Sequence, residues 1–279
     1  MGSGLGTSEQ GLGYHEKWLR NAQRREVPRR VVAEIARRAA LTPAGFGVLR
    51  GMEEIRDPDG KSFFLIPRGT PGADARRAAL LTYVLNAGTD YGAPGRPADF
   101  PAAPYSADEV ARIAARQRAN NWTYTRDVRF VDRNGGRLVT TPNGMLMGVG
   151  GNVIQRQFSR RGGTTWGDLF MVNMGFTRGF TRGFTVGFKT GRADDPADRL
   201  RRIVGSGHAW YVDAVGEPFE SNLDLDRLLH HEERHSRQWA QKGYAGMIRD
   251  YGRELIRELA FGKPNRLEED AGLSDGGYR

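Results

Sequence analysis

The chain contains no cysteine and no long apolar segment, and each absence excludes a class of protein. Without cysteine there is no disulfide framework, no thiolate metal site and no thiol nucleophile. A membrane-spanning helix needs roughly 20 apolar residues, whereas the longest uncharged run, residues 138–155, is interrupted by proline, asparagine and glycine. The first residues, MGSGLGTSEQ, lack the basic and apolar parts of a secretory signal. We therefore expect the protein to be cytoplasmic or exported by a signal-independent route.

Lysine is also scarce, which changes how the net charge of +9 is interpreted. Of the 42 basic residues, 5 are lysines and the other 37 are arginines, a ratio typical of the codon choice of a GC-rich genome. Residues 221–279 carry 10 basic and 11 acidic side chains, a net charge of −1, so the positive charge belongs to the rest of the chain. A high arginine content of this kind says little about a partner. Nucleic acid is therefore not expected to be the main ligand.

The residues that are present are sufficient for a folded core, because 38% of the 279 residues are hydrophobic and 10% are aromatic. Apolar residues at helical spacing, together with capping signals, predict helices over residues 14–40, 74–88 and 106–120. A short apolar run predicts a strand over residues 62–66. Residues 1–120 are therefore expected to form a mainly helical region within an α+β fold.

Residues 121–204 are rich in glycine and poor in helix signals, and are expected to form short strands and loops. Alternating residues over 122–131 predict a strand, and the glycines at 135 and 136 predict a hairpin turn before a second strand. The sequence GFTR then repeats in tandem over residues 175–188. We interpret the repeat either as a tolerated duplication or as a phenylalanine-lined surface that docks a partner or a membrane.

The C-terminal region, residues 205–279, contains the motif that carries chemistry. The sequence HEERH is an H-E-x-x-H pattern, in which His231 and His235 are four positions apart and share one face of a helix. Two imidazoles one turn apart can bind a single Zn²⁺ ion, and Glu232 is placed to act on a water molecule there. Leucines before the motif and Gly243 after it predict a packed helix that ends at that glycine.

A zinc site of this type needs a third ligand, and three glutamates downstream are candidates. A second helix is predicted over residues 244–261, and it carries Glu254 and Glu258. Asn265 and Glu268 form a capping-box pattern at the start of a short terminal helix, which returns the chain toward the motif after a helical hairpin. Glu268 is the preferred ligand, and Glu258 and Glu254 remain alternatives.

The motif helix, with the later N-x-x-E-x-x-A segment around Glu268, resembles the HExxH zincin-like metallopeptidase domains common in actinobacteria, several of which occur in polymorphic-toxin proteins. The resemblance covers about residues 205–279. It implies that His231, His235 and Glu268 bind Zn²⁺ in a zincin-like helical segment. It also implies that Glu232 is the catalytic base, that the substrate is a protein or peptide, and that a cognate inhibitor or immunity protein is a possible partner.

His208 lies on a predicted strand just before the motif helix and is a candidate for substrate binding, because such a strand can pair with an extended peptide. Two functions follow from the sequence. In the first, the protein is a zinc metallopeptidase in which Glu232 activates a water molecule. In the second, it is a non-enzymatic secreted or scaffold protein, in which the zincin-like C-terminus is structural and the basic, glycine-rich front binds a partner.

Overall fold

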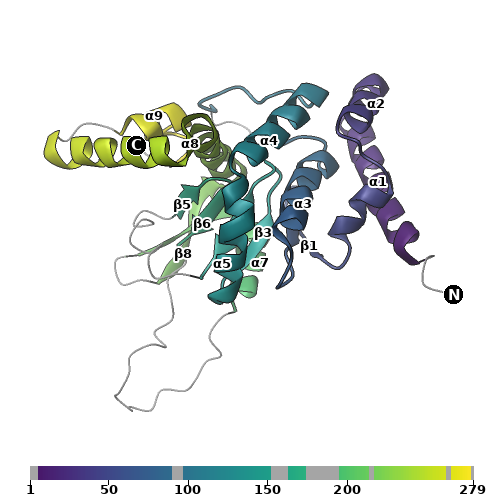
Figure 1. The fold of residues 1–279 in the computed structure, drawn as a ribbon, viewed down its shortest axis with the longest axis horizontal. Helices are drawn as coiled ribbons and strands as arrows, with labels where there is room; N and C mark the ends of the chain where they lie inside the picture. The colour runs from purple at the N-terminus through teal and green to yellow at the C-terminus, as the bar shows by residue number, and fades with distance from the viewer. Residues whose placement is uncertain are drawn as a thin grey trace, which may run out of the picture.

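A computed structural model describes residues 6–89, 97–151, 163–173, 195–213, 217–261 and 265–277. These residues form an α+β fold, in which a six-stranded sheet and a separate two-stranded sheet are surrounded by helices (Figure 1). The GFTR repeat, residues 175–188, lies outside the described residues. Within the described ranges, no helix is long and apolar enough to cross a membrane.

The larger sheet has the strand order β1-β2-β3-β4-β6-β5, and its neighbouring strands are antiparallel except for the parallel pair β4 and β6. Its strands are β1 (Glu53–Arg56), β2 (Ser62–Leu65), β3 (Arg137–Thr140), β4 (Leu146–Val149), β5 (Gly163–Trp166) and β6 (Leu169–Val172). The strands β5 and β6 form a tight hairpin, which brings Trp166 opposite Leu169.

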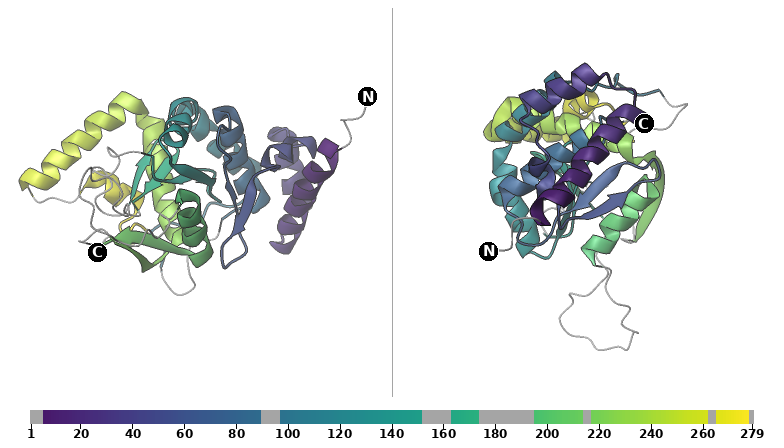
Figure 2. Two further views of the ribbon diagram at one scale, coloured as in Figure 1. Left: turned by 90° about the horizontal axis from the view of Figure 1, so that it is seen from below. Right: turned by 90° about the vertical axis from the view of Figure 1, so that its right-hand side faces the viewer.

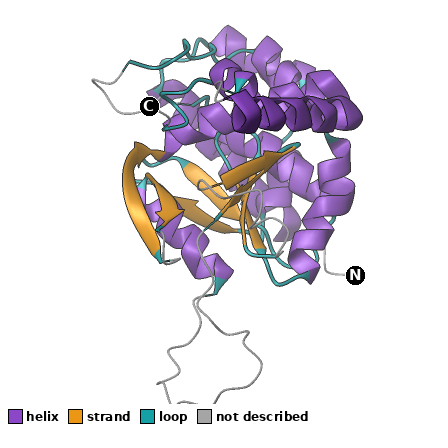
Figure 3. Cartoon of the chain, turned by 90° about the vertical axis from the view of Figure 1, so that its left-hand side faces the viewer, coloured by secondary structure: helices purple, strands orange, loops and turns teal. Residues whose placement is uncertain are grey.

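Helices cover both faces of this sheet, because successive strand residues point to opposite faces and both sets are apolar (Figure 3). On one face, Phe63 and Phe170 pack against α7 (Pro196–Ser206). On the other face, Phe64 and Leu138 pack in clusters with helical side chains. The helices of this second layer are α3 (Gly72–Leu85), α4 (Ala107–Ala119) and α5 (Val128–Arg133).

The N-terminal helices α1 (Gly6–Arg24) and α2 (Arg29–Arg38) lie at one end of the molecule (Figure 2). The sequence predicts one continuous helix over residues 14–40, and that prediction is wrong. The chain breaks where Glu26 adopts a φ of 56° and Pro28, which has no backbone N–H, precedes α2. The short 3₁₀ helix η1 (Ala44–Leu49) then packs against α1.

The strand predicted over residues 122–131 is also wrong, because this segment is helical. A π-helical turn, η2 (Thr123–Asp127), leads directly into α5. The buried residues Tyr124, Val128 and Val131 recur at intervals of four and three, which is the spacing of a helix face. The predicted turn at glycines 135 and 136 does precede a strand, β3, but it connects that strand to a helix.

The C-terminal part begins with the antiparallel pair β7 (His208–Val212) and β8 (Pro218–Asp224). Strand β8 continues directly into α8 (Leu225–Phe261), which bends at Gly243. The φ of 68° and ψ of 168° at Gly243 interrupt the helical backbone, as the sequence predicts. The short helix α9 (Arg266–Ala271) follows.

The first two regions expected from the sequence share one sheet, and all three share one core cluster. Strands β1 and β2 come from residues 1–120 and β3 to β6 come from residues 121–204, yet they belong to the same sheet. One hydrophobic cluster contains Phe63, Met147 and Leu229, a residue from each region. The boundaries near residues 120 and 204 therefore divide the sequence without dividing the core.

The first residue of helix α3, Gly72, packs directly against η2, and a substitution there tests this packing. A Cβ atom at Gly72 would lie 2.0 Å from the carbonyl oxygen of Tyr124. We expect Gly72→Ala to destabilise the protein by about 1–3 kcal/mol in urea unfolding, because backbone must move to admit the methyl group. Gly205→Ala in α7 is the control: it has no neighbour within 4 Å, and the better helix former should stabilise by up to about 1 kcal/mol. Unchanged stability of the Gly72 variant would contradict the close packing.

Candidate metal centre

The first half of α8, residues 225–242, carries the H-E-x-x-H motif and is anchored at its start. The Asp224 carboxylate Oδ1 caps the helix by accepting a hydrogen bond from the backbone N–H of Asp226 at 2.8 Å. Leu225 and Leu229 are buried in the core cluster beneath the larger sheet. The motif is therefore on a packed helix, with one face in the core.

Three potential ligand atoms from α8 and α9 converge at the motif. The Nε2 atoms of His231 and His235 are 3.0 Å apart. A carboxylate oxygen of Glu268, Oε2, lies 3.2 Å from His231 Nε2 and 3.3 Å from His235 Nε2. The two imidazoles are buried, at 2% and 9% exposure. Two imidazole nitrogens and a carboxylate oxygen are a donor set that Zn²⁺ accepts, so the side chains present fit such an ion.

Hydrogen bonds at the other ring nitrogens orient both imidazoles. His231 Nδ1 lies 2.9 Å from the carbonyl oxygen of Gly272, and His235 Nδ1 lies 2.9 Å from Oε1 of Gln238. The Gln238 amide nitrogen in turn donates to the Leu267 carbonyl and to Asp270. Because both acceptors require an N–H at Nδ1, Nε2 is the unprotonated nitrogen of each neutral imidazole, and a proton added at Nε2 is donated to Glu268. The arrangement therefore collects acceptors that repel one another unless a cation lies between them.

The charge of Glu268 is matched to this arrangement. Burial opposes ionisation of Glu268, but hydrogen bonds from the two imidazoles hold the pKa of its carboxyl well below the usual range. In the same way burial lowers the pKa of His235, but the Glu268 carboxylate more than offsets this and raises it to about 9. The cluster thus binds positive charge strongly in the form of a proton, and a metal ion would compete with that proton.

Glu268 reaches the motif because α9 folds back on α8. Asn265 Oδ1 caps α9 by accepting from Leu267 N at 2.9 Å. Glu254, an alternative ligand in the sequence, instead accepts a hydrogen bond from the backbone of Arg266 at 3.0 Å and supports the start of α9. The side chain of Glu258, the other alternative, lies outside the described residues.

A buried clasp holds the segment after α9, which supplies the Gly272 carbonyl. Arg227 of α8 donates to the Asp275 carboxylate at 2.6 Å, and both side chains are almost fully buried. Backbone N–H groups of Asp99 and Asp275 each bond the carboxylate of the other residue, at 3.3 and 2.8 Å. Gly272, with φ of 96°, packs closely against Asp99. The clasp therefore fixes the acceptor that orients His231.

Glu232 points toward the edge strand of the larger sheet. Its Oε2 accepts a hydrogen bond from the Thr165 hydroxyl of β5 at 2.6 Å. Burial raises the pKa of Glu232, although the neighbouring imidazoles act in the opposite direction. The carbonyl oxygen of the same Thr165 accepts from the Trp239 indole at 3.1 Å, so β5 holds the motif helix at two points about two turns apart. No local pattern in the sequence indicates Thr165, because its contact depends on strand order.

The sequence also did not predict a polar network on the other side of α8. Glu233, the second glutamate of the motif, is buried and forms ion pairs with Arg116 and Arg112 of α4 and with Arg237. Arg116 also bonds the fully buried Asp168, which lies between β5 and β6. Asp168 accepts further hydrogen bonds from groups on three elements: Asn120, Tyr124 and Ser236. The network ties α4, η2 and the sheet to the motif helix.

The other two histidines near the motif in sequence are placed elsewhere. His208, the candidate for substrate binding, is half exposed on β7 and pairs with Glu220 of β8 at 2.6 Å; the structure does not bring it into the ligand cluster. His230 bonds the Asp226 carbonyl and the Thr89 hydroxyl, at 2.8 and 2.9 Å. Burial lowers the pKa of His230 to about 4.

A second group of carboxylates, Asp57, Asp59 and Asp226, also lies close together. The buried ammonium group of Lys61 contacts Asp226 and lies 3.9 Å from Asp59. This acidic group therefore contains its own cation, and we do not count it as a metal site.

Comparisons with known protein families, with curated proteins and with solved structures find no match for this chain.

The buried pair of Glu233 and Arg116 predicts how stability depends on pH. Burial raises the pKa of Glu233, but the neighbouring arginines more than offset this and lower it to about 2, against roughly 4.3 in an unfolded chain. Because the folded-state value is lower, the ionised carboxylate stabilises the fold above roughly pH 4, and this contribution is lost as the pH falls toward 2. We expect Glu233→Gln to destabilise by about 3–5 kcal/mol at neutral pH, because three guanidinium groups lose one carboxylate partner each.

Urea unfolding of wild type and Glu233→Gln at several pH values measures this effect. The variant should lose less stability than the wild type between roughly pH 5 and pH 2. Glu16→Gln removes an exposed carboxylate that is 3.6 Å from Arg20 and is the matched control, with little expected change. The prediction would be contradicted if the free energy of unfolding of the wild type and of the Glu233 variant fell equally as the pH is lowered.

Proposed function

We propose that the chain is a zinc-dependent peptidase, in which His231, His235 and Glu268 hold Zn²⁺ and Glu232 is the general base. The observation that carries the proposal is the convergence of two Nε2 atoms and one carboxylate oxygen within 3.3 Å of one another. Their orientation by acceptors at both Nδ1 atoms supports it, because ordinary packing gives no reason for three acceptors to face each other.

The chemistry divides between the ion and the chain. Zinc in such a donor set supplies Lewis acidity, which polarises a carbonyl group and makes water a nucleophile at neutral pH. Glu232 accepts the proton of that water and delivers it to the leaving amine. Its raised pKa makes it a stronger base than an exposed glutamate. Thr165 donates to Oε2 of Glu232 and so orients the carboxylate.

The assignment of a peptide as the substrate rests on the zincin-like resemblance of residues 205–279. Hydrolysis of an amide is the reaction that this combination of an ion and a buried carboxylate serves. Strand β5 is an edge strand of the larger sheet, but its Thr165 carbonyl already accepts a hydrogen bond from Trp239 of α8. Strands β7 and β8 form a two-stranded sheet, and an extended peptide can add to such an edge by backbone pairing. His208 lies on β7 and would then contact the substrate.

Metal content and peptide cleavage test the proposal on the full chain. Wild type, purified without chelators, is expected to contain one zinc per chain by mass spectrometry. Glu268→Gln and His235→Ala should lose most of the metal, whereas His208→Ala, which removes an exposed histidine, should retain it. Glu232→Gln should retain zinc but lose roughly 10²- to 10⁴-fold in cleavage of a peptide library.

Two outcomes would count against the proposal. Metal-free wild type, after zinc has been supplied, would remove the metal centre. Stoichiometric zinc with cleavage unaffected by Glu232→Gln, or with no cleavage at all, would favour the non-enzymatic interaction protein with a structural C-terminus.

Gln238 provides a separate test of how the ligands are oriented. Gln238→Leu removes the acceptor at His235 Nδ1 and the bonds to Leu267 and Asp270. We expect zinc affinity, measured by competition with a chelator, to fall roughly 10- to 100-fold, because the ring loses its fixed orientation. Gln241→Leu, an exposed position on the same helix, is the control. Equal affinities of the two variants would show that Gln238 does not orient the ligand.

A further inference from the structure

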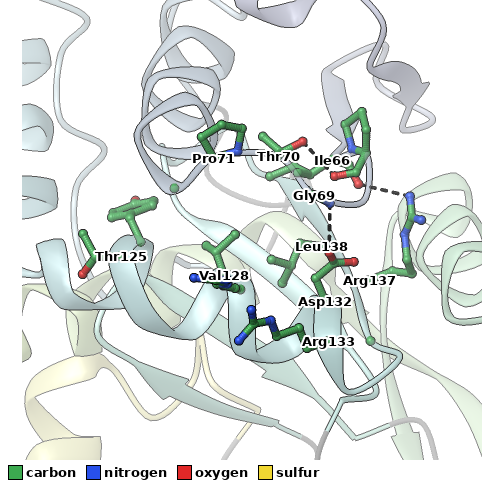
Figure 4. A pocket seen from close by; sticks show the side chains of 15 residues that line it. Ile66, Gly69, Thr70, Pro71, Thr125, Val128, Asp132, Arg133, Arg137 and Leu138 are labelled. Carbon is green, nitrogen blue, oxygen red and sulfur yellow. Dashed lines mark hydrogen bonds between the residues drawn. The ribbon is translucent and has the colours of Figure 1, made fainter.

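A cavity of about 530 Å³ lies beside η2, and none of its lining residues belongs to the metal centre. It is enclosed by the start of α3, by η2 and α5, and by the ends of β2 and β3 (Figure 4). Cavities of a few hundred to about 1,000 Å³ are typical of small-molecule sites. The size of this one is therefore sufficient for an organic molecule.

Three arginines and one acidic residue line the cavity, so basic side chains outnumber acidic ones there. Arg129, Arg133 and Arg137 face a single carboxylate, Asp132. That carboxylate is already engaged, because its oxygens accept from the Gly69 backbone at 2.9 Å and from Arg68 at 3.0 Å. The cavity thus has a surplus of positive charge that Asp132 does not neutralise.

Two of these arginines have guanidinium N–H groups that are not used in contacts with the described residues. In the part of the chain that the structure describes, no hydrogen bond or ion pair engages the guanidinium groups of Arg129 and Arg133, which are one helical turn apart on α5. Arg137 donates from Nη2 to the Ile66 carbonyl at 3.1 Å. Burial and the nearby charge of Arg68 lower the pKa of Arg137. An anion in the cavity would relieve this repulsion and form charge-assisted hydrogen bonds with Arg129 and Arg133, which are exposed to solvent.

The floor of the cavity is apolar. Ile66, Tyr124, Val128 and Leu138 line it, and all are buried in the core. Figure 4 shows Leu138 beside Asp132, with Val128 on one side of it and Arg137 on the other. A ligand with one charged end and one apolar end would fill such a space better than an inorganic ion.

The wall contributed by η2 has an unusual backbone. The π-helical turn Thr123–Asp127 supplies Tyr124 and Thr125 to the lining. π-Helical turns are rare, and they occur frequently at functional sites. The closeness of Gly72 to the Tyr124 carbonyl keeps α3 against this wall. The shape of the cavity is therefore part of the packed fold.

We propose that this cavity binds a small organic anion, whose phosphate or carboxylate group is held by Arg129, Arg133 and Arg137 and whose apolar part rests on Val128 and Leu138. Guanidinium groups suit both oxyanions, because each offers paired N–H donors in one plane. The site is independent of the metal centre, so it can be tested in the presence of a chelator.

Isothermal titration with four probes tests the class of ligand. Phenyl phosphate and benzoate carry a charged and an apolar end, inorganic phosphate lacks the apolar end, and benzyl alcohol lacks the charge. We expect phenyl phosphate or benzoate to bind at least about tenfold more tightly than the other two, and the tighter of the pair identifies the oxyanion. Equal binding of inorganic phosphate and phenyl phosphate would contradict the role of the apolar floor.

Paired variants test the residues. Arg129→Gln with Arg133→Gln should weaken binding of the better probe by about tenfold or more, because two charge-assisted contacts are lost. Arg30→Gln with Arg37→Gln removes the same charge from exposed positions on α2 and should leave binding unchanged. Thermal unfolding of both double variants checks that they are folded. Equal weakening by the two pairs, or no binding of either organic anion to wild type below roughly 1 mM, would overturn the proposal.

Discussion

Acceptor atoms that face one another in a buried space repel, and the C-terminal part of this protein is built around such a group. The acceptors at Gly272 and Gln238 take the Nδ1–H of each imidazole, so both Nε2 lone pairs point toward the Glu268 carboxylate. The low dielectric constant of the interior strengthens both the repulsion and the attraction for a cation. A proton on His235, whose pKa the carboxylate raises to about 9, is one solution, and a metal ion with three ligands is the other.

The surrounding structure holds these atoms in place through buried charges. The Arg227–Asp275 pair fixes the segment that carries Gly272, and the Arg116–Glu233 pair fixes the helix that carries the histidines. Buried ion pairs add little net stability, since desolvation offsets most of the attraction. Their value here is geometric, because a ligand set functions only if its atoms are held to within a fraction of an ångström. Residues far apart in sequence are needed for that purpose.

The sequence predicted several local features correctly. It was wrong for two segments, and it did not indicate most of the contacts between residues that are far apart in the chain. The helix that ends at Gly243, the Ser106 cap of α4 and the short strand β2 follow from local signals, and the structure has all three. The single helix over residues 14–40 and the strand over 122–131 were wrong, because a proline break outweighed the apolar period and an apparent alternation concealed a helical one. The four-residue spacing indicated His231 and His235, and the capping pattern after an expected helical hairpin indicated Glu268. Nothing local indicated Thr165, Asp168 or Arg116, whose roles depend on strand order and helix packing.

The zincin-like resemblance stops near residue 205, but the motif helix is packed against residues well before that point. Asp168 joins Ser236 of the motif helix to Tyr124, a residue whose ring also lines the arginine-rich cavity. Thr165 bonds Glu232, and the strand that carries it belongs to a sheet built from residues 53–172. A segment cut at residue 205 would expose the leucines of α8 and leave Glu233 without Arg116. The motif helix therefore shares a core with described residues that precede position 205, and contacts with those residues hold the helix that carries the histidines.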